Sequence, residues 1–473
     1  MPQSEDADLV RDLQRLVQRL NEMPDDRDAA LTPIGLKVRD YLGVDPAGLP
    51  LLREDLPPHR LVDADIALDA LAARDKSAVI VGIGGGQERQ HEDLAGLLVH
   101  RFTQFREGQI EYATAATGPS STRQTVSFGL RMLHFGGVAV VVLQRAANRM
   151  FGRESASLEV LCSDATVASE FMTELQQLMI ELSVVRGNVV GFAPSEYGQG
   201  IGHMTFLPRP DVAASEVILS PGLLDDIRGH VVDIGAHAGR LRSLHQHLKR
   251  GVLLYGPPGT GKTLTVRHLL AATPGTTAVV LQGGSLAYVG EAARLARALS
   301  PAIVVLEDVD LVAMERGMFG GPQPLLFEIL DAMDGVEGDT DIAFILTTNR
   351  ADVLEPALAA RPGRVDLAVE IPLPDATARR ALFRLYGASV PLSGEVLDAA
   401  ADRAEGVTAS FAKELIRRTV LHATVRGSDV VDSDLTEALD AMLAAQVGIS
   451  RVLFGGDGSE SELDAPGHIT FGY

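Results

Sequence analysis

One eight-residue segment constrains the fold of this chain more than any other feature of its sequence. The segment GPPGTGKT, residues 256–263, follows the strand-like run GVLLY and precedes the helix-like run LTVRHLL. Its glycines let backbone N–H groups turn toward an anion, and the following helix presents its positive N-terminus to the same anion. Lys262 is placed to reach the β- and γ-phosphates of a nucleotide, and the Thr263 hydroxyl to hold Mg²⁺. The plain alternative is a Gly/Pro turn between a strand and a helix. The predicted nucleotide contacts of this loop are Gly256, Pro257, Pro258, Gly259, Thr260, Gly261, Lys262, Thr263 and Leu264.

Two acidic residues at the end of another strand-like run extend this pattern. The run IVVLEDVD places four apolar residues, 303–306, directly before Glu307 and Asp308. Open α/β sheets bind ligands at the carboxyl ends of their strands, so both carboxylates should lie near the phosphates. One carboxylate should hold the water shell of Mg²⁺ and the other should orient the attacking water; we assign the metal to Glu307. A lone acidic strand end is more often a solvated turn, but the phosphate loop upstream favours the catalytic interpretation.

The alternation of elements predicts an α/β fold with additional parts on both sides. Short β-branched runs alternate with helical stretches over residues 211–375, which predicts a parallel sheet between helices, the P-loop ATPase core. Residues 376–452 show helical periodicity only and predict a small helical lid. Residues 61–210 mix both patterns and predict an α+β domain, whereas residues 1–60 predict a helix and a Pro/Gly-rich linker. Residues 453–473 are acidic and rich in Gly and Ser, which is typical of a flexible tail.

The amino-acid composition limits which classes of partner and which cellular compartment are expected for this protein. The net charge is −21, the wrong sign for wrapping a phosphate backbone, so nucleic acid is disfavoured as a partner. The acidic start of the chain does not resemble an export signal, and the longest apolar run, 138–143, is far shorter than a membrane helix needs. The single cysteine, Cys162, predicts a small buried hydrophobe in a protein of a reducing compartment, the cytoplasm.

From about Val217 to Val447 the sequence resembles the AAA family of ATPases (AAA+). Tyr288-Val289-Gly290 is similar to the aromatic loop that lines the central pore in members that thread polypeptides. The segment MDGV, 333–336, resembles the segment through which neighbouring subunits sense each other. The remaining matches imply single residues: Asn349 as the polar sensor that orients the attacking water, Arg361 and Arg364 as arginine fingers, and Ala409 as a nucleotide contact in the lid.

The resemblance implies an ATP- and Mg²⁺-dependent ring, with six copies of the chain as the usual number. The arginine fingers would act in the neighbouring subunit's site, and the N-terminal domain would recruit a polypeptide that is unfolded, translocated or remodelled through the pore. Without this context, two such arginines are more often plain surface charges. Tyr288 has an equally plain alternative, which is packing under the following helix. An ATP-gated scaffold with slow turnover and a nucleic-acid motor remain as alternative functions.

Two departures from the family pattern carry consequences. The acid pair is ordered Glu307-Asp308, the reverse of most members, and Asp310 two places on fixes this register. An Asp308 base is one methylene shorter than glutamate, so hydrolysis could be slow. The family's adenine-contacting Asp-Ile-Gly-Gly is replaced by Val-Ile-Leu at 217–219, so adenine is expected near Ile218 and the helix of Ile227.

Overall fold

The computed structural model describes residues 31–194, 201–310, 328, 331–333, 339–350 and 365–454. The chain divides into two compact units. Unit 1 comprises residues 1–208 together with 275–279 and 298–300, and unit 2 comprises the rest. The predicted fold class is confirmed, since a β-rich α+β unit precedes a P-loop α/β core with a helical lid.

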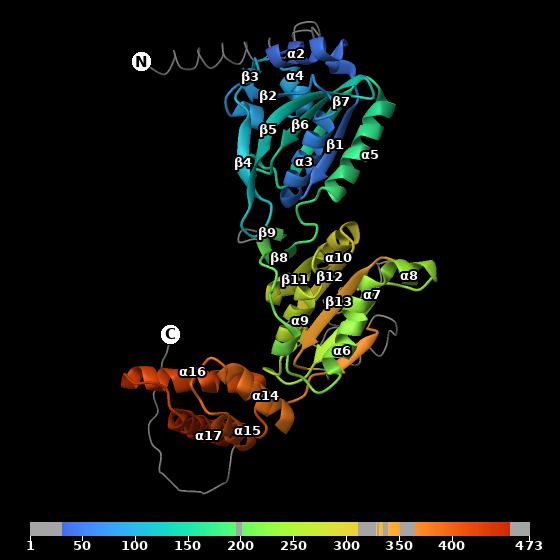
Figure 1. Cartoon of the computed structure of the whole chain (residues 1–473). Helices are drawn as coiled ribbons and strands as arrows, with labels where there is room; N and C mark the ends of the chain where they lie inside the picture. The colour runs from blue at the N-terminus through green and yellow to red at the C-terminus, as the bar shows by residue number, and fades with distance from the viewer. Residues whose placement is uncertain are drawn as a thin grey trace, which may run out of the picture. The chain divides into compact units, whose positions relative to one another are not determined.

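Unit 1 is built on an antiparallel sheet with the strand order β1-β7-β6-β5-β2-β3, in which β4 also pairs with β5. The two faces of the sheet bury alternate residues of the same strand, as the period of two requires. On β6, Val140 and Val142 contribute to one core, whereas Val141 and Leu143 contribute to the other. Unit 1 therefore has helices on both sides of its sheet (Figure 1). The strands are β1 (Leu51–Leu56), β2 (Val79–Gly84), β3 (Arg106–Gly108), β4 (Glu111–Ala116), β5 (Thr122–Phe135), β6 (Val138–Arg145) and β7 (Ala156–Cys162), followed by the hairpin β8 (Val189–Pro194) and β9 (Ile201–Leu207).

Helices α3 (Leu61–Ala72) and α5 (Ala165–Glu181) cover one face, and α2 (Pro33–Leu42) and α4 (Leu94–Leu98) pack on the other. The predicted linker is wrong over residues 31–60, because α2 buries Ile34 and Val38 completely and β1 pairs with β7. Two of the prolines that suggested a linker, Pro46 and Pro58, begin the short 3₁₀ helices Pro46–Gly48 and Pro58–Arg60 before and after β1. Cys162 lies in the α3/α5 core as a free, buried cysteine, as the sequence predicts.

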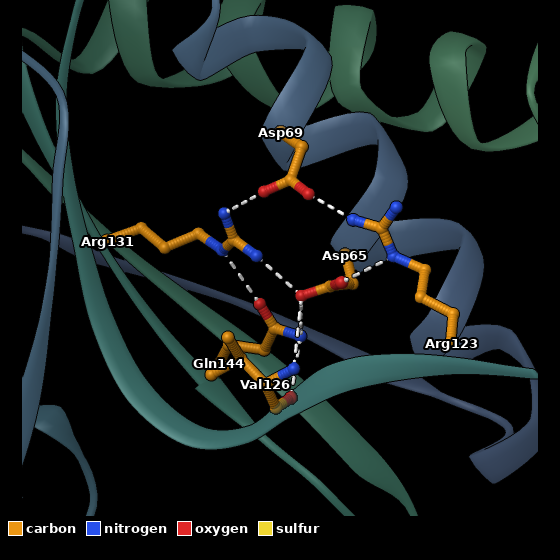
Figure 2. Close-up of polar contacts among 6 residues, drawn as sticks. All are labelled: Asp65, Asp69, Arg123, Val126, Arg131 and Gln144. Carbon is orange, nitrogen blue, oxygen red and sulfur yellow. Dashed lines mark hydrogen bonds and ion pairs between the residues drawn. The ribbon is translucent and has the colours of Figure 1, made fainter. Parts of the chain in front are cut away.

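A buried ion-pair network ties α3 to the sheet (Figure 2). Asp65 and Arg131 are each 2% exposed and form an ion pair between α3 and β5. Gln144 of β6 donates to Asp65 Oδ1 at 3.2 Å and accepts from Arg131 Nε at 3.0 Å. Asp69 bridges Arg131 to Arg123 at the exposed end of the network. Charges held out of water need such complete pairing, so this network fixes the position of α3 on the strands.

Unit 2 contains the predicted α/β core. Its strands follow the order β14-β10-β13-β12-β11, and the pairs β10–β13, β10–β14 and β12–β13 are parallel. Every residue of β13 is buried, as expected for a strand covered on both faces. Its strands are β10 (Arg250–Tyr255), β11 (Thr277–Gln282), β12 (Ala302–Glu307), β13 (Ile342–Thr348) and β14 (Leu367–Glu370), and its helices are α6 (Leu223–Arg228), a π-helical turn (Gly229–Asp233), α7 (Ile234–Ala236), α8 (Ala238–Ser243), α9 (Lys262–Ala271), the 3₁₀ helix η8 (Gly283–Tyr288) and α10 (Val289–Ala298).

Four helices form the lid at the C-terminal side of this core. They are α14 (Ala376–Gly387), α15 (Gly394–Arg403), α16 (Ala409–Arg426) and α17 (Asp432–Phe454), and they share one apolar core. Asp375, Ser393 and Thr408 each accept a backbone N–H of the helix that follows, which fixes where α14, α15 and α16 begin.

Candidate functional site

The phosphate-loop segment turns sharply between β10 and α9. Gly256 has a φ of +140° and Gly259 a φ of +78°, a region that side-chain-bearing residues rarely adopt. A Cβ at position 256 would also lie 2.2 Å from the carbonyl oxygen of Ile371. The Thr260 hydroxyl donates to Pro257 O at 2.9 Å and closes the loop. The loop therefore has the strand–loop–helix context predicted for phosphate binding.

Lys262 lies over this loop at the first position of α9. Its side chain is largely buried, and Nζ donates to Gly256 O and Pro257 O at 2.8 Å each. Burial lowers the pKa of Lys262, and the nearby carboxylates of Asp308 and Asp310 act in the opposite direction. The ammonium group of Lys262 thus contacts two carbonyl oxygens of the phosphate loop and lies near the carboxylates of Asp308 and Asp310.

Glu307 ends β12 beside the phosphate loop. Burial and the charge of Asp308 raise the pKa of Glu307, whereas a hydrogen bond with the Thr263 side chain and the charge of Arg267 lower it. The structure therefore brings together the two residues predicted to hold Mg²⁺. Hydroxyl and carboxylate oxygens are the donors that this ion prefers, so the pair fits the group.

Asp308 has a φ of +50°, a left-handed conformation that is uncommon for a residue with a side chain. Its N–H donates to Thr347 Oγ1 at 3.0 Å, across from β12 to β13. The amide Nδ2 of Asn349 donates to Asp308 Oδ1 at 3.4 Å. The second predicted carboxylate and the predicted sensor are thus in contact, because β12 and β13 are parallel neighbours whose ends meet.

Asp310 belongs to the same cluster, although sequence reasoning used it only to fix the register of the acid pair. It is 3% exposed, and its Oδ1 accepts the Thr348 hydroxyl at 2.9 Å and the Asn349 N–H at 3.1 Å. The signal in the sequence was a third acid, two residues after the acid pair that follows a fully apolar run.

A cleft of about 620 Å³ joins the phosphate loop to the lid. Its lining combines the loop, Asp308 and Asn349 with apolar side chains of the lid and of the segment before α6. Ile218, expected near adenine, is one of these apolar residues, whereas Ile227 is fully buried and is not among the described lining residues. The cleft is lined by Glu216, Val217, Ile218, Leu219, Pro258, Gly259, Thr260, Gly261, Lys262, Thr263, Leu264, Arg267, Asp308, Asn349, Leu382, Leu385, Tyr386, Ala409, Ser410 and Lys413.

The lid touches the phosphate loop directly. The Ser410 N–H donates to Gly259 O at 3.1 Å, and a Cβ at position 259 would lie 2.9 Å from Ser410 Oγ. Ala409, the predicted lid contact, lines the cleft beside it. A glycine at 259 is therefore required both by its φ and by the approach of the lid.

Tyr288, Val289 and Gly290 lie at the junction of η8 and α10 and are not among the described lining residues of the cleft. Val289 is 1% exposed and packs in the core, which leaves its side chain almost no surface to contact a polypeptide. Tyr288 is half-buried and Gly290 is exposed. The predicted arginine fingers, Arg361 and Arg364, and residues 334–336 of the MDGV segment lie outside the described residues.

Comparison with known protein families matches a part of the chain that carries many of the cleft residues. The sequence pattern of the family described as "ATPase family associated with various cellular activities (AAA)" matches residues 252–373, which include the phosphate loop, Glu307, Asp308 and Asn349. Residues 252–373 belong to the AAA ATPase family. Within the parts that the structure describes, no three His, Cys, Asp or Glu residues form a group that could hold a metal ion by themselves. No helix in the described ranges has the length and apolarity to cross a bilayer.

Known AAA proteins align with this chain over about half its length or less. It is 33% identical over 281 residues to an ATP-dependent zinc metalloprotease FtsH 3 of Sphaerobacter thermophilus, covering 56% of each chain. It is 36% identical over 224 residues to a 26S proteasome regulatory subunit 6B homolog of Aspergillus niger, covering 43% of this chain and 52% of the relative. With the human ATPase family gene 2 protein homolog A, the identity is 40% over 160 residues, 31% of this chain and 18% of the relative. The chain thus spans 56%, 52% and 18% of the length of these three relatives.

Proposed function

We propose that this AAA domain hydrolyses ATP with Mg²⁺ and uses the energy to unfold, translocate or remodel polypeptides. The observation that carries the proposal is the convergence of Lys262, Asp308 and Asn349 on one cleft beside the phosphate loop. A phosphate-binding lysine, a carboxylate and a polar sensor are the groups that phosphoryl transfer to water needs.

In this proposal each residue of the cleft has one task. Lys262 binds the β- and γ-phosphate oxygens, and the apolar lining residue Ile218 contacts adenine. Thr263 and Glu307 would hold Mg²⁺, which supplies positive charge to the phosphate oxygens when bound. The pKa of Glu307 is raised by burial and by Asp308, so a cation beside it would favour its ionised form.

Asp308 and Asn349 act on the attacking water. The carboxylate of Asp308 accepts a proton as the water oxygen bonds to the γ-phosphorus and the bond to the β–γ bridging oxygen breaks. The products are ADP and inorganic phosphate. Asn349, whose amide already contacts the Asp308 carboxylate, orients the same water. Arg361 and Arg364 are proposed to enter the cleft of a neighbouring copy and stabilise the charge of the transition state, which implies a ring, with six copies as the family number.

A polypeptide as substrate is supported by the relatives and by one residue of this chain. A metalloprotease and a proteasome regulatory subunit, by their names, serve protein breakdown. Tyr288 is half-buried at the end of η8, directly before α10, whereas Val289 is core. We therefore assign contact with an extended chain to Tyr288 alone, with unit 1 recruiting the polypeptide. The single cysteine supports a cytoplasmic location.

The test is ATP-driven unfolding of a fluorescent reporter protein with an unstructured tail, followed by loss of fluorescence with a trap that prevents refolding. We expect loss of fluorescence with ATP and none with a non-hydrolysable analogue. A second candidate, a slowly cycling scaffold, is favoured by the short, left-handed Asp308. A turnover far below one per minute that unfolded polypeptide does not raise would decide for the scaffold.

A further inference from the structure

Asp310 is a buried carboxylate to which the proposed reaction assigns no step. Its Oδ1 accepts two hydrogen bonds, from the Thr348 hydroxyl at 2.9 Å and from the Asn349 N–H at 3.1 Å. A carboxylate that is 3% exposed is costly unless it is hydrogen-bonded. Both donors are consecutive residues at the end of β13, so this one side chain ties the end of β12 to the end of β13.

The hydrogen bonds to Asp310 determine where Asn349, the proposed sensor, lies. The Asn349 backbone is held by Asp310, and its side-chain amide reaches Asp308 at 3.4 Å. The Thr348 hydroxyl, which donates to Asp310, also accepts the Arg350 N–H at 3.0 Å. The backbone on both sides of the Asn349 side chain is thus fixed through contacts that begin at Asp310.

A second hydrogen bond between the same two segments holds Asp308. The Asp308 N–H donates to Thr347 Oγ1 at 3.0 Å, which supports its left-handed backbone. Thr347 therefore places Asp308, and Asp310 places Asn349. The described lining residues of the cleft do not include Asp310, and its hydrogen bonds reach the cleft through the lining residue Asn349.

We propose that Asp310 is a positioning residue for hydrolysis, which fixes Asn349 so that its amide faces the Asp308 carboxylate and the attacking water. This inference rests on the proposed function, since it requires ATP hydrolysis in this cleft. The proposal requires different effects on turnover and on binding. Removal of the Asp310 side chain lowers kcat, whereas the affinity for the nucleotide stays the same.

The test compares Asp310→Ala with Asp310→Asn in the full chain. The alanine variant loses both hydrogen bonds and should show kcat reduced about tenfold to a hundredfold, with ATP affinity within about twofold of wild type. Asparagine keeps an oxygen that can accept both hydrogen bonds and should retain kcat within about threefold. Asp341→Ala is the matched control, because this buried aspartate lies at the opposite end of β13, paired with Arg250 at 2.7 Å. It should lower the melting temperature without changing kcat of the folded protein.

The decisive comparison is a double-mutant cycle with Asn349→Ala. If Asp310 acts through Asn349, Asp310→Ala should lower kcat by less than about twofold in the Asn349→Ala background. If Asp310→Ala does not fold, Thr348→Val serves in its place, since it removes one of the two donors. Multiplicative effects in the cycle, or a parallel loss of ATP affinity, would overturn the positioning role. An inactive wild type would instead overturn the proposed function, and the positioning role with it.

Discussion

The side-chain amide of Asn349 donates a hydrogen bond of 3.4 Å to the Asp308 carboxylate and so joins the ends of β13 and β12. Both side chains lie at the carboxyl ends of parallel strands and line the same cleft as Lys262. This contact places the proposed base and the proposed sensor where one water can touch both.

Asp308→Asn should abolish turnover while preserving the fold and nucleotide binding. Asparagine tolerates the left-handed backbone at φ +50° better than most residues, so the strand end should keep its conformation. Its amide cannot accept the proton of the attacking water, so kcat should fall by about a hundredfold or more. Steady-state kinetics and ATP binding by the purified variant check this.

Asp308→Ala is the matched comparison for the backbone. It should be as inactive as Asp308→Asn but melt at a lower temperature, because alanine is strained at positive φ. Full activity of Asp308→Asn would show that this carboxylate is not the base.

Glu307→Gln should raise the melting temperature of the nucleotide-free protein at neutral pH and remove the Mg²⁺ dependence of ATP binding. The pKa of Glu307 is raised in the folded chain, by burial first and then by Asp308. Its ionised form is therefore disfavoured by folding, and the penalty is complete above the folded pKa and absent below the unfolded pKa. The gain in stability should disappear as the pH falls below the ordinary glutamate range. Thermal unfolding at a series of pH values measures it.

Glu370→Gln provides the control, because Glu370 is an exposed residue at the end of β14. It should leave both the melting temperature and the Mg²⁺ dependence unchanged. A Glu307→Gln protein that is less stable at neutral pH would contradict the account of this site.

Tyr288→Ala should leave ATP turnover within about twofold and eliminate unfolding of the tailed reporter, because the tyrosine lies outside the described lining of the cleft. Val289→Ala should instead destabilise the fold by about 2 kcal/mol, since its side chain is buried. Reporter fluorescence and ATP turnover, measured in the same sample of Tyr288→Ala, separate the loss of unfolding from a loss of ATP hydrolysis. Unfolding that survives in Tyr288→Ala would remove this residue from substrate contact.

Arg131→Ala should destabilise unit 1 by about 3–5 kcal/mol, because it leaves the buried Asp65 carboxylate without its cation. Arg123→Ala should cost about 1 kcal/mol or less, since the Arg123 side chain is 38% exposed. Hydrogen exchange of α3 amides in the full chain reports both changes. Equal effects of the two variants would show that the network of Figure 2 does not depend on burial.

The places of the phosphate loop and the acid pair in the fold could be predicted from the sequence because their motifs are local. A strand–loop–helix with GPPGTGKT has few alternative conformations, and the apolar run before Glu307-Asp308 favours a buried strand that ends with both acids at the sheet's edge. The contact of Asn349 with Asp308 follows from the parallel arrangement of β12 and β13. The roles assigned to these residues remain predictions.

The features that the sequence missed depend on contacts between distant segments. β1 pairs with β7 about a hundred residues later, and the prolines around β1 suggested a linker instead. Asp310 has a defined role only once the end of β13 lies beside it. The resemblance placed Val289 in the pore loop, but the helix α10 begins at this residue and its side chain is buried in the core.

The most direct test of the central claim is the steady-state rate of ATP hydrolysis by the full chain with Mg²⁺, measured beside Lys262→Ala and Lys249→Ala. Lys262 contacts the phosphate loop, whereas Lys249 donates to Met333 O at 3.1 Å and is not among the described lining residues of the cleft. We predict Mg²⁺-dependent turnover in the wild type, the same turnover in Lys249→Ala, and none in Lys262→Ala. Turnover by Lys262→Ala equal to that of the wild type would contradict the assignment of ATP hydrolysis to this cleft.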